Sequence, residues 1–95
     1  MNLLITYDLD NGHEEVKNYL LAAGYSEEIS KNNKKMRLPN TTLWGDKLSS
    51  QAVSLDFKNA CNAYNRSCRY EKDKIKNSSH FVVMIDFSEF WMETV

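Results

Sequence analysis

Apolar and polar residues alternate at the start of the chain, and this pattern of β-branched and aromatic residues predicts a strand over residues 2 to 8. Similar runs predict strands over 41 to 45 and over 81 to 87. A weaker pattern over 25 to 30 indicates a short edge strand. Residues 31 to 37 are mostly polar, so we expect them to form a loop.

Two other stretches place apolar residues at helical spacing. The first predicts a helix over about 12 to 23, with Asp10 or Asn11 as its N-cap. The second follows Ser49 or Ser50, either of which can cap it. Its apolar stripe consists of Val53, Phe57, Ala60, Cys61, Tyr64 and Cys68.

The order strand, helix, strand, strand, helix, strand is the βαββαβ arrangement of a ferredoxin-like α+β fold. We expect residues 1–95 to form a single domain, with a four-stranded antiparallel sheet and two helices on one face. The first strand is then central, and its end at Asp8 lies near Thr41, Thr42 and His80. The basic loop that follows the second strand and the basic segment that precedes the fourth strand are expected to open at that same end.

The face of the sheet away from the helices, here called the open face, is expected to be partly apolar. Successive residues of a strand point to opposite faces of the sheet. We expect the odd-numbered residues of the first and last strands to lie under the helices: Ile5, Tyr7, Phe81, Val83, Ile85 and Phe87. The open face then carries Leu4, Thr6, Asp8, His80, Val82, Met84 and Asp86. Such a mixed face is typical of an interface. The aromatic tail from Phe87 to Met92 is expected to pack on its own core or on a sister subunit.

Composition indicates a soluble protein of ordinary character. The 95 residues are 42% hydrophobic and 26% charged. No apolar run approaches the ~20 residues that span a bilayer, and no basic segment followed by a long apolar stretch begins the sequence. We therefore expect a cytoplasmic protein without a membrane partner.

The net charge of -1 gives no global signal for nucleic acid, but the basic residues are clustered. The first cluster contains Lys31, Lys34, Lys35 and Arg37, and the second contains Arg66, Arg69 and Lys72. Both are expected at one end of the sheet, where they would contact the phosphates of a nucleic acid. The alternative is that both are solvated loops.

Two carboxylates follow the first strand. If the extended conformation continues, Asp8 and Asp10 leave the same face roughly 6.6 Å apart. That arrangement suits a hard cation such as Mg²⁺. The same segment is also typical of a loop and helix cap, for which Asp10 is the better placed residue. His80 can serve as acid or base if it lies near Asp8, although a histidine at a strand start is often a solvated residue.

Three segments together resemble a known family of small ferredoxin-like proteins: Leu4 to Leu9, Leu38 to Gly45 and Phe81 to Ile85. The family is the superfamily of CRISPR-associated protein two, which includes the toxin virulence-associated protein D and SinR-like relatives. The resemblance implies a homodimer with facing sheets, in which each subunit contributes the aspartate that ends its first strand. In this sequence that residue is Asp8.

The resemblance further implies either of two activities, because members include metal-dependent nucleases and scaffolds that hold nucleic acid for an integrase. We expect a dimeric, Mg²⁺-dependent endonuclease, similar to an endoribonuclease, that acts on RNA or DNA. Asp8 and His80 are its candidate catalytic residues, and Asp8 and Asp10 its candidate metal ligands. The alternative is a non-catalytic module of the same fold that binds nucleic acid or assembles with an integrase or an antitoxin.

Overall fold

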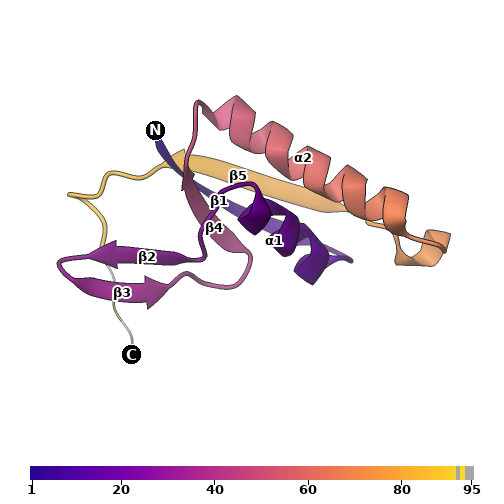
Figure 1. The fold of residues 1–95 in the computed structure, drawn as a ribbon, viewed down its shortest axis with the longest axis horizontal. Coiled ribbons are helices and arrows are strands. Elements are labelled where there is room, and N and C mark those ends of the chain that lie inside the picture. Colours follow the sequence, from indigo (N-terminus) through magenta and orange to yellow (C-terminus); the bar gives the residue numbers. More distant parts are fainter. Residues whose placement is uncertain (92, 94–95) are drawn as a thin grey trace.

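The computed structural model describes residues 1–91 and 93 (Figure 1). Its helices are α1 (His13–Ala22), α2 (Ser50–Ser67) and the short 3-10 helix η1 (Glu71–Asp73). Its strands are β1 (Asn2–Leu9), β2 (Glu28–Lys31), β3 (Lys34–Arg37), β4 (Thr42–Asp46) and β5 (Ser78–Met84).

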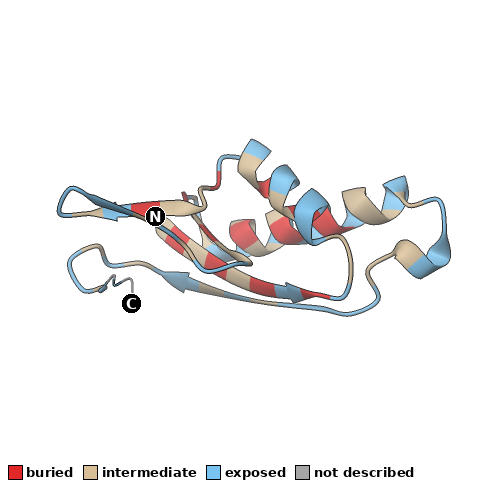
Figure 2. Ribbon diagram, turned by 90° about the horizontal axis from the view of Figure 1, so that it is seen from below, coloured by how far each residue is buried: buried red, intermediate tan, exposed pale blue. Residues whose placement is uncertain are grey.

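The strands form two antiparallel sheets. The larger one has the order β4-β1-β5, with β1 in the centre as predicted. Both long helices lie on one side of it (Figure 2), which confirms an α+β arrangement with one covered face. The predicted four-stranded sheet is wrong, because β2 pairs with β3 in a separate hairpin.

Only one residue of the edge strand predicted over 25 to 30 pairs with the larger sheet. The Ser26 amide donates to the Trp44 carbonyl at 2.7 Å, and the Trp44 amide donates back to the Ser26 carbonyl at 3.0 Å. This bridge lies beside β4, on the edge that a ferredoxin-like second strand would occupy. The chain then leaves the sheet, and β2 continues away from it toward the hairpin tip (Figure 1).

The turn at the hairpin tip explains why residues 31 to 37 are not the predicted loop. Asn32 and Asn33 have φ angles of 53° and 64°, in the left-handed region that asparagine tolerates. Two consecutive residues of this kind form the tight turn that matches the twist of a hairpin. Ile29 on β2 is buried and lies opposite Met36 on β3, so the hairpin has an apolar pair of its own.

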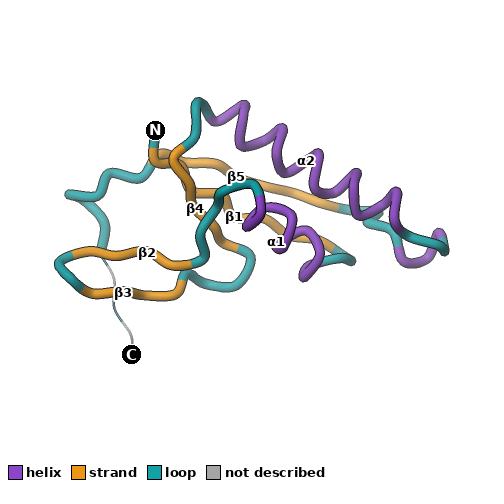
Figure 3. Tube along the Cα trace, viewed as in Figure 1, coloured by secondary structure: helices purple, strands orange, loops and turns teal. Residues whose placement is uncertain are grey.

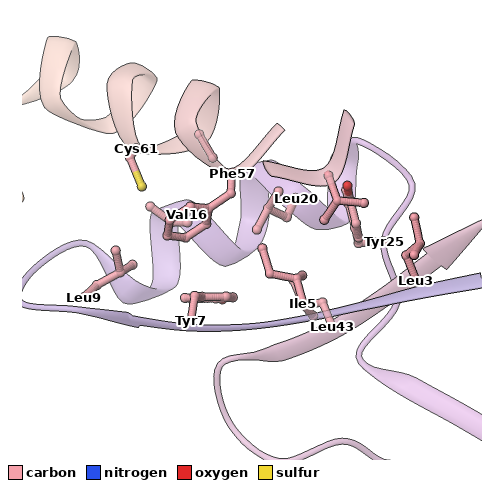
Figure 4. Close-up of a cluster of buried hydrophobic side chains, with 12 residues drawn as sticks. Leu3, Ile5, Tyr7, Leu9, Val16, Leu20, Tyr25, Leu43, Phe57 and Cys61 are labelled. Carbon is pink, nitrogen blue, oxygen red and sulfur yellow. The ribbon is translucent and has the colours of Figure 1, made fainter. Parts of the chain in front are cut away.

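The main core lies between the large sheet and the helices (Figure 4). Alternate residues of β1 are buried, as the parity of that strand predicted, and the Tyr7 ring packs 5.2 Å from the Phe57 ring. The core consists of Leu3, Ile5, Tyr7, Leu9, Val16, Leu20, Tyr25, Leu43, Val53, Phe57, Ala60 and Cys61.

The predicted parity of β5 is wrong. Val82 lies opposite the buried Ile5 and packs against the core, whereas Phe81 lies opposite Thr6 and is 62% exposed. Met84 and His80 likewise pair with helix-facing positions of β1. The run from Phe81 to Ile85 is apolar throughout and does not alternate with polar residues. Its sequence therefore does not indicate which side chains face the helices, and the pairing with β1 decides this. The open face therefore carries Leu4, Thr6, Asp8, Thr42, Trp44, Ser79, Phe81 and Val83.

The predicted N-cap is confirmed for α2 and is wrong for α1. Ser49 caps α2, because its hydroxyl accepts a bond from the Ala52 amide at 3.1 Å. Gly12 precedes α1 without a side-chain cap, so the caps predicted at Asp10 and Asn11 are wrong. A Cβ at Gly12 would lie 2.7 Å from a Tyr64 ring atom, which explains the glycine. Within the described residues, the helices are too short or too polar to cross a membrane.

Candidate functional site

Asp8 is the last open-face residue of β1. It lies opposite Ser79 on β5, and its carboxylate is exposed. Two residues earlier, Thr6 lies between Phe81 on one side and Thr42 on the other, and the Thr42 hydroxyl donates to the Thr6 hydroxyl at 3.3 Å. No hydrogen bond or ion pair engages the Asp8 side chain within the described ranges. Asp8 is therefore a carboxylate available to a ligand.

Asp10 holds a backbone segment. Its two carboxylate oxygens accept bonds from the Lys76 amide, at 3.1 and 3.2 Å, and from the Asn77 amide, at 3.0 Å. These contacts fix the chain just before β5. Asp10 and Asp8 line a pocket of about 240 Å³ together with Leu9, Asn77, Ser78 and Ser79. Of the two carboxylates, Asp8 is the one with unused acceptor positions.

The pocket borders a segment that we call the end loop, residues 68–77, which joins α2 to β5 and contains η1. Asn11 donates to the carbonyls of Lys72 at 3.4 Å and Lys74 at 3.2 Å. The Tyr64 hydroxyl donates to the Asp73 carbonyl at 2.7 Å. The end loop is thus tied to both the start of α1 and the last turns of α2.

Tyr64 remains a donor to the end loop over the whole neutral range. Its pKa is raised to about 12, first by the hydrogen bond with Cys68 and then by loss of hydration. Beside it, Asn65 accepts a bond from the Ile75 amide at 2.8 Å. These contacts give the end loop a fixed backbone path.

His80 lies on the helix side of the sheet and not beside Asp8. Its Nε2 atom is 2.7 Å from the Ser54 hydroxyl oxygen on α2, and its ring packs 4.9 Å from the Phe57 ring. It is opposite Tyr7, whose side chain is in the core. Asp8 and His80 are close in the sheet but project from opposite faces.

Three of the four cations in the first basic cluster contact other residues of the chain, in the hairpin or in the tail. Lys31 donates to the Phe90 carbonyl and lies over the Phe90 ring. Lys35 forms an ion pair with Glu28 at 2.9 Å. Arg37 contacts Glu27 at 3.2 Å. Lys34 is exposed near the tip. Two of its four cations, Lys35 and Arg37, are therefore paired with carboxylates within the described residues.

Glu27 links the hairpin to the first helix. Lys17 on α1 contacts its carboxylate at 2.5 Å, on the same oxygen that Arg37 contacts. The hydrogen bond from Lys17, followed by that from Arg37, lowers the pKa of Glu27. The two cations thus keep this carboxylate ionised to lower pH than an isolated glutamate.

The second basic cluster is exposed at the end loop. Arg66, Arg69 and Lys72 form no ion pair within residues 1–91 and 93, whereas Glu71 is paired with Lys74 at 3.1 Å and Lys76 at 3.3 Å. Tyr70 is 54% exposed, and its ring lies close to two of these cations, Arg69 and Lys72. Sequence reasoning missed Tyr70, although an aromatic residue set among arginines and lysines was a signal for it.

The two basic clusters lie at opposite ends of the molecule, whose longest extent is 46 Å (Figures 1 and 3). Their predicted convergence is wrong, because β2 leaves the sheet and carries its following turn away from the end of β1. Only the second cluster shares the end of the sheet where Asp8 lies. That end combines a free carboxylate, three unpaired cations and an exposed tyrosine.

The tail covers another part of the open face. Phe87 packs edge-on against Trp44 with ring centroids 5.4 Å apart, and Phe90 packs on Phe87 at 5.4 Å. The tail therefore packs on its own chain, although Met92 lies outside the described residues. Phe81 and Val83 stay exposed on the same face, at 62% and 38%, opposite Thr6 and Leu4 of β1.

The donor set at Asp8 fits Mg²⁺ only with help from elsewhere. Within the described part of the chain, no three His, Cys, Asp or Glu side chains gather to hold a metal ion. Mg²⁺ keeps several waters and needs one or two carboxylates, so Asp8 with a second carboxylate or a phosphate is a sufficient set. Asp10 is the less suitable ligand because the end loop occupies its oxygens.

Comparison with protein-family models, with curated proteins and with solved structures finds no match to this chain in any of the three.

Proposed function

We propose that this chain is a homodimeric, Mg²⁺-dependent nuclease whose two copies pack through their open faces. The observation that carries the proposal is the position of Asp8, a free carboxylate on the same face as the exposed Phe81 and Val83. Large apolar side chains on a sheet face favour burial against a partner. A carboxylate drawn into such an interface needs a cation to compensate it.

A two-fold axis near Asp8 would bring the same residue from both copies together. The repulsion between two such carboxylates is relieved by a shared divalent cation, and oxygen ligands of this kind suit Mg²⁺. When bound, Mg²⁺ supplies charge stabilisation at a phosphate and a water of lowered pKa. Asp8 would hold the ion, while the pocket shared with Ser79 and Asn77 leaves space for a phosphate.

The end loop supports nucleic acid as the substrate. Three exposed cations have no ion-pair partner within the described residues: Arg66 in the last turn of α2, and Arg69 and Lys72 in the end loop. The end loop borders the Asp8 pocket. Guanidinium and ammonium groups bind phosphates through charge and hydrogen bonds, without reading sequence. The substrate class is therefore RNA or DNA, bound with little sequence preference.

The position of His80 favours a second candidate function, a dimer that binds without catalysis. Because this side chain bonds to Ser54 beneath α2, it does not serve as an acid or base beside Asp8. The same dimer would then bind nucleic acid without cutting it, as a scaffold for an integrase, or assemble with a protein such as an antitoxin. In that case Asp8 would hold a structural cation or a basic partner.

A cleavage assay with and without Mg²⁺ tests the nuclease proposal. We expect the wild-type chain to cut RNA or DNA in Mg²⁺, to stop in EDTA, and to lose at least about 100-fold in rate in the D8N variant, which keeps shape but loses charge. E14Q is the matched control, since Glu14 is an exposed carboxylate in the first turn of α1, on the helix side of the sheet. Binding to nucleic acid without any cleavage would instead support the second function.

A further inference from the structure

We propose that Tyr70 stacks on a base of single-stranded nucleic acid and that Arg69 and Lys72 hold the phosphates on either side. This inference rests on the proposed function in naming nucleic acid as the ligand. It does not need cleavage. It assigns a binding role to a residue outside the Asp8 pocket and narrows the substrate to unpaired strands.

The first observation is the exposure of the Tyr70 ring. This residue precedes η1, has an extended backbone and is 54% exposed. The Arg69 guanidinium carbon lies 5.7 Å from the ring centroid and the Lys72 Nζ atom lies 5.8 Å from it. An exposed ring next to cations is the combination that single-strand binding proteins use, where bases stack on the ring and cations follow the backbone.

The second observation is the local charge. Residues 66 to 77 contain five basic and two acidic residues in a chain whose net charge is -1. Lys74 and Lys76 both contact Glu71, so they compensate it and leave Arg69 and Lys72 free for other anions. Two cations without ion-pair partners among the described residues therefore lie next to the Tyr70 ring.

The third observation is the fixed path of the backbone that presents this ring. Asn11 bonds to two carbonyls of the end loop, and Tyr64 and Asn65 bond to it from α2. Asp10 secures its last two residues. A loop held by four side chains loses little conformational entropy when a ligand binds, which favours a binding role over that of a solvated connection.

The ligand is a single strand because only unpaired bases expose their faces to a side-chain ring. The weak contacts of Arg69 and Lys72 with the ring can be exchanged for stronger contacts with phosphates when a base arrives. The end loop continues into Asn77 and Ser78 at the Asp8 pocket.

The experiment measures binding of a fluorescently labelled 12-nucleotide single strand by anisotropy. All variants carry D8N and the buffer contains EDTA, so cleavage cannot contribute. We expect Y70F to bind within about twofold of the parent, because the ring is kept, and Y70L to bind about tenfold more weakly, because the ring is lost. Y19L is the matched control, since Tyr19 on α1 is 42% exposed and distant in sequence from the end loop.

A duplex of the same sequence separates stacking from simple attraction to phosphates. We expect it to bind more weakly than the single strand and to be unaffected by Y70L, while circular dichroism shows that Y70L stays folded. Equal binding of the single strand by Y70L and its parent overturns the inference, even if wild type cleaves nucleic acid. Tyr70-dependent binding without any cleavage by wild type supports the inference and counts against the nuclease.

Discussion

His80 and Ser54 are joined by a hydrogen bond of 2.7 Å that ties β5 to α2. The bond lies on the helix side of the sheet, where the imidazole also packs against Phe57 at 4.9 Å. Asp8 projects from the other face. The two candidate catalytic residues thus differ: His80 is bound within the fold, and Asp8 is exposed on the open face.

Replacing His80 should therefore affect folding more than activity. We expect H80A to lower the free energy of unfolding by about 1 kcal/mol or more, because it removes a hydrogen bond and a ring contact. The rate of Mg²⁺-dependent cleavage should stay within about threefold of wild type. Urea denaturation and a cleavage assay on the same sample check both. A loss of cleavage by H80A in a fully folded, equally stable protein would contradict this assignment.

Asp10 should be a structural residue as well. We expect D10A to lower the free energy of unfolding by about 1.5 kcal/mol, because the Lys76 and Asn77 amides lose a charged acceptor. Hydrogen exchange should accelerate at those two amides and less in D10N, whose amide oxygen still accepts one bond. Unchanged exchange at both amides in D10A would show that the end loop is held by other contacts.

The strands and helices that form the core could be predicted because the spacing of their apolar residues matches the faces that are buried in the structure. Alternation in β1, helical spacing in α2 and the Ser49 cap all appear in the structure as expected. The β2–β3 hairpin was missed because its residues are mostly polar, although Asn32 and Asn33 are typical of a tight hairpin turn. Once that turn forms, β2 pairs with β3 and the larger sheet keeps only three strands.

The site was harder to predict than the core. The position of Asp8 on the open face follows from the alternation of β1 alone. The position of His80 depends on the register between β5 and β1, and a continuous run such as Phe81 to Ile85 carries no information about which face it presents. The partners of Asp10 and Asn11 lie more than 60 residues away in sequence, so local cap patterns could not reveal them.

Substitutions at two neighbouring residues of β5 should have different effects, one on the dimer and one on the stability of the subunit. F81E should dissociate the dimer and leave the subunit folded, because the Phe81 side chain is 62% exposed on the open face. V82E should lower the free energy of unfolding by more than about 2 kcal/mol, because it places a charge against the core.

Sedimentation velocity and thermal unfolding distinguish the two effects. L55E is the control for added charge, since Leu55 is 58% exposed on α2, on the other side of the sheet. A dimer that survives F81E, or that L55E dissociates, would place the interface elsewhere.

The contacts of Glu27 with Lys17 and Arg37 should make hairpin attachment sensitive to acid. Because these cations lower the pKa of Glu27 in the folded chain, its contribution to stability is present above the usual glutamate pKa of 4.5. That contribution disappears as the pH falls through the lowered value. We expect unfolding free energy to fall less steeply in E27Q than in wild type below pH 4.5. Parallel curves for the two proteins would contradict this role.

The central claim is that Asp8 from two copies forms one site, and subunit mixing tests it most directly. Wild-type and D8N chains are unfolded together and refolded at known ratios, and the rate of Mg²⁺-dependent cleavage is measured at each ratio. The proposed site requires both carboxylates, so the rate should fall as the square of the wild-type fraction. A rate that falls in simple proportion to that fraction would show that each copy acts alone, and a wild-type protein that never cleaves would contradict the nuclease itself.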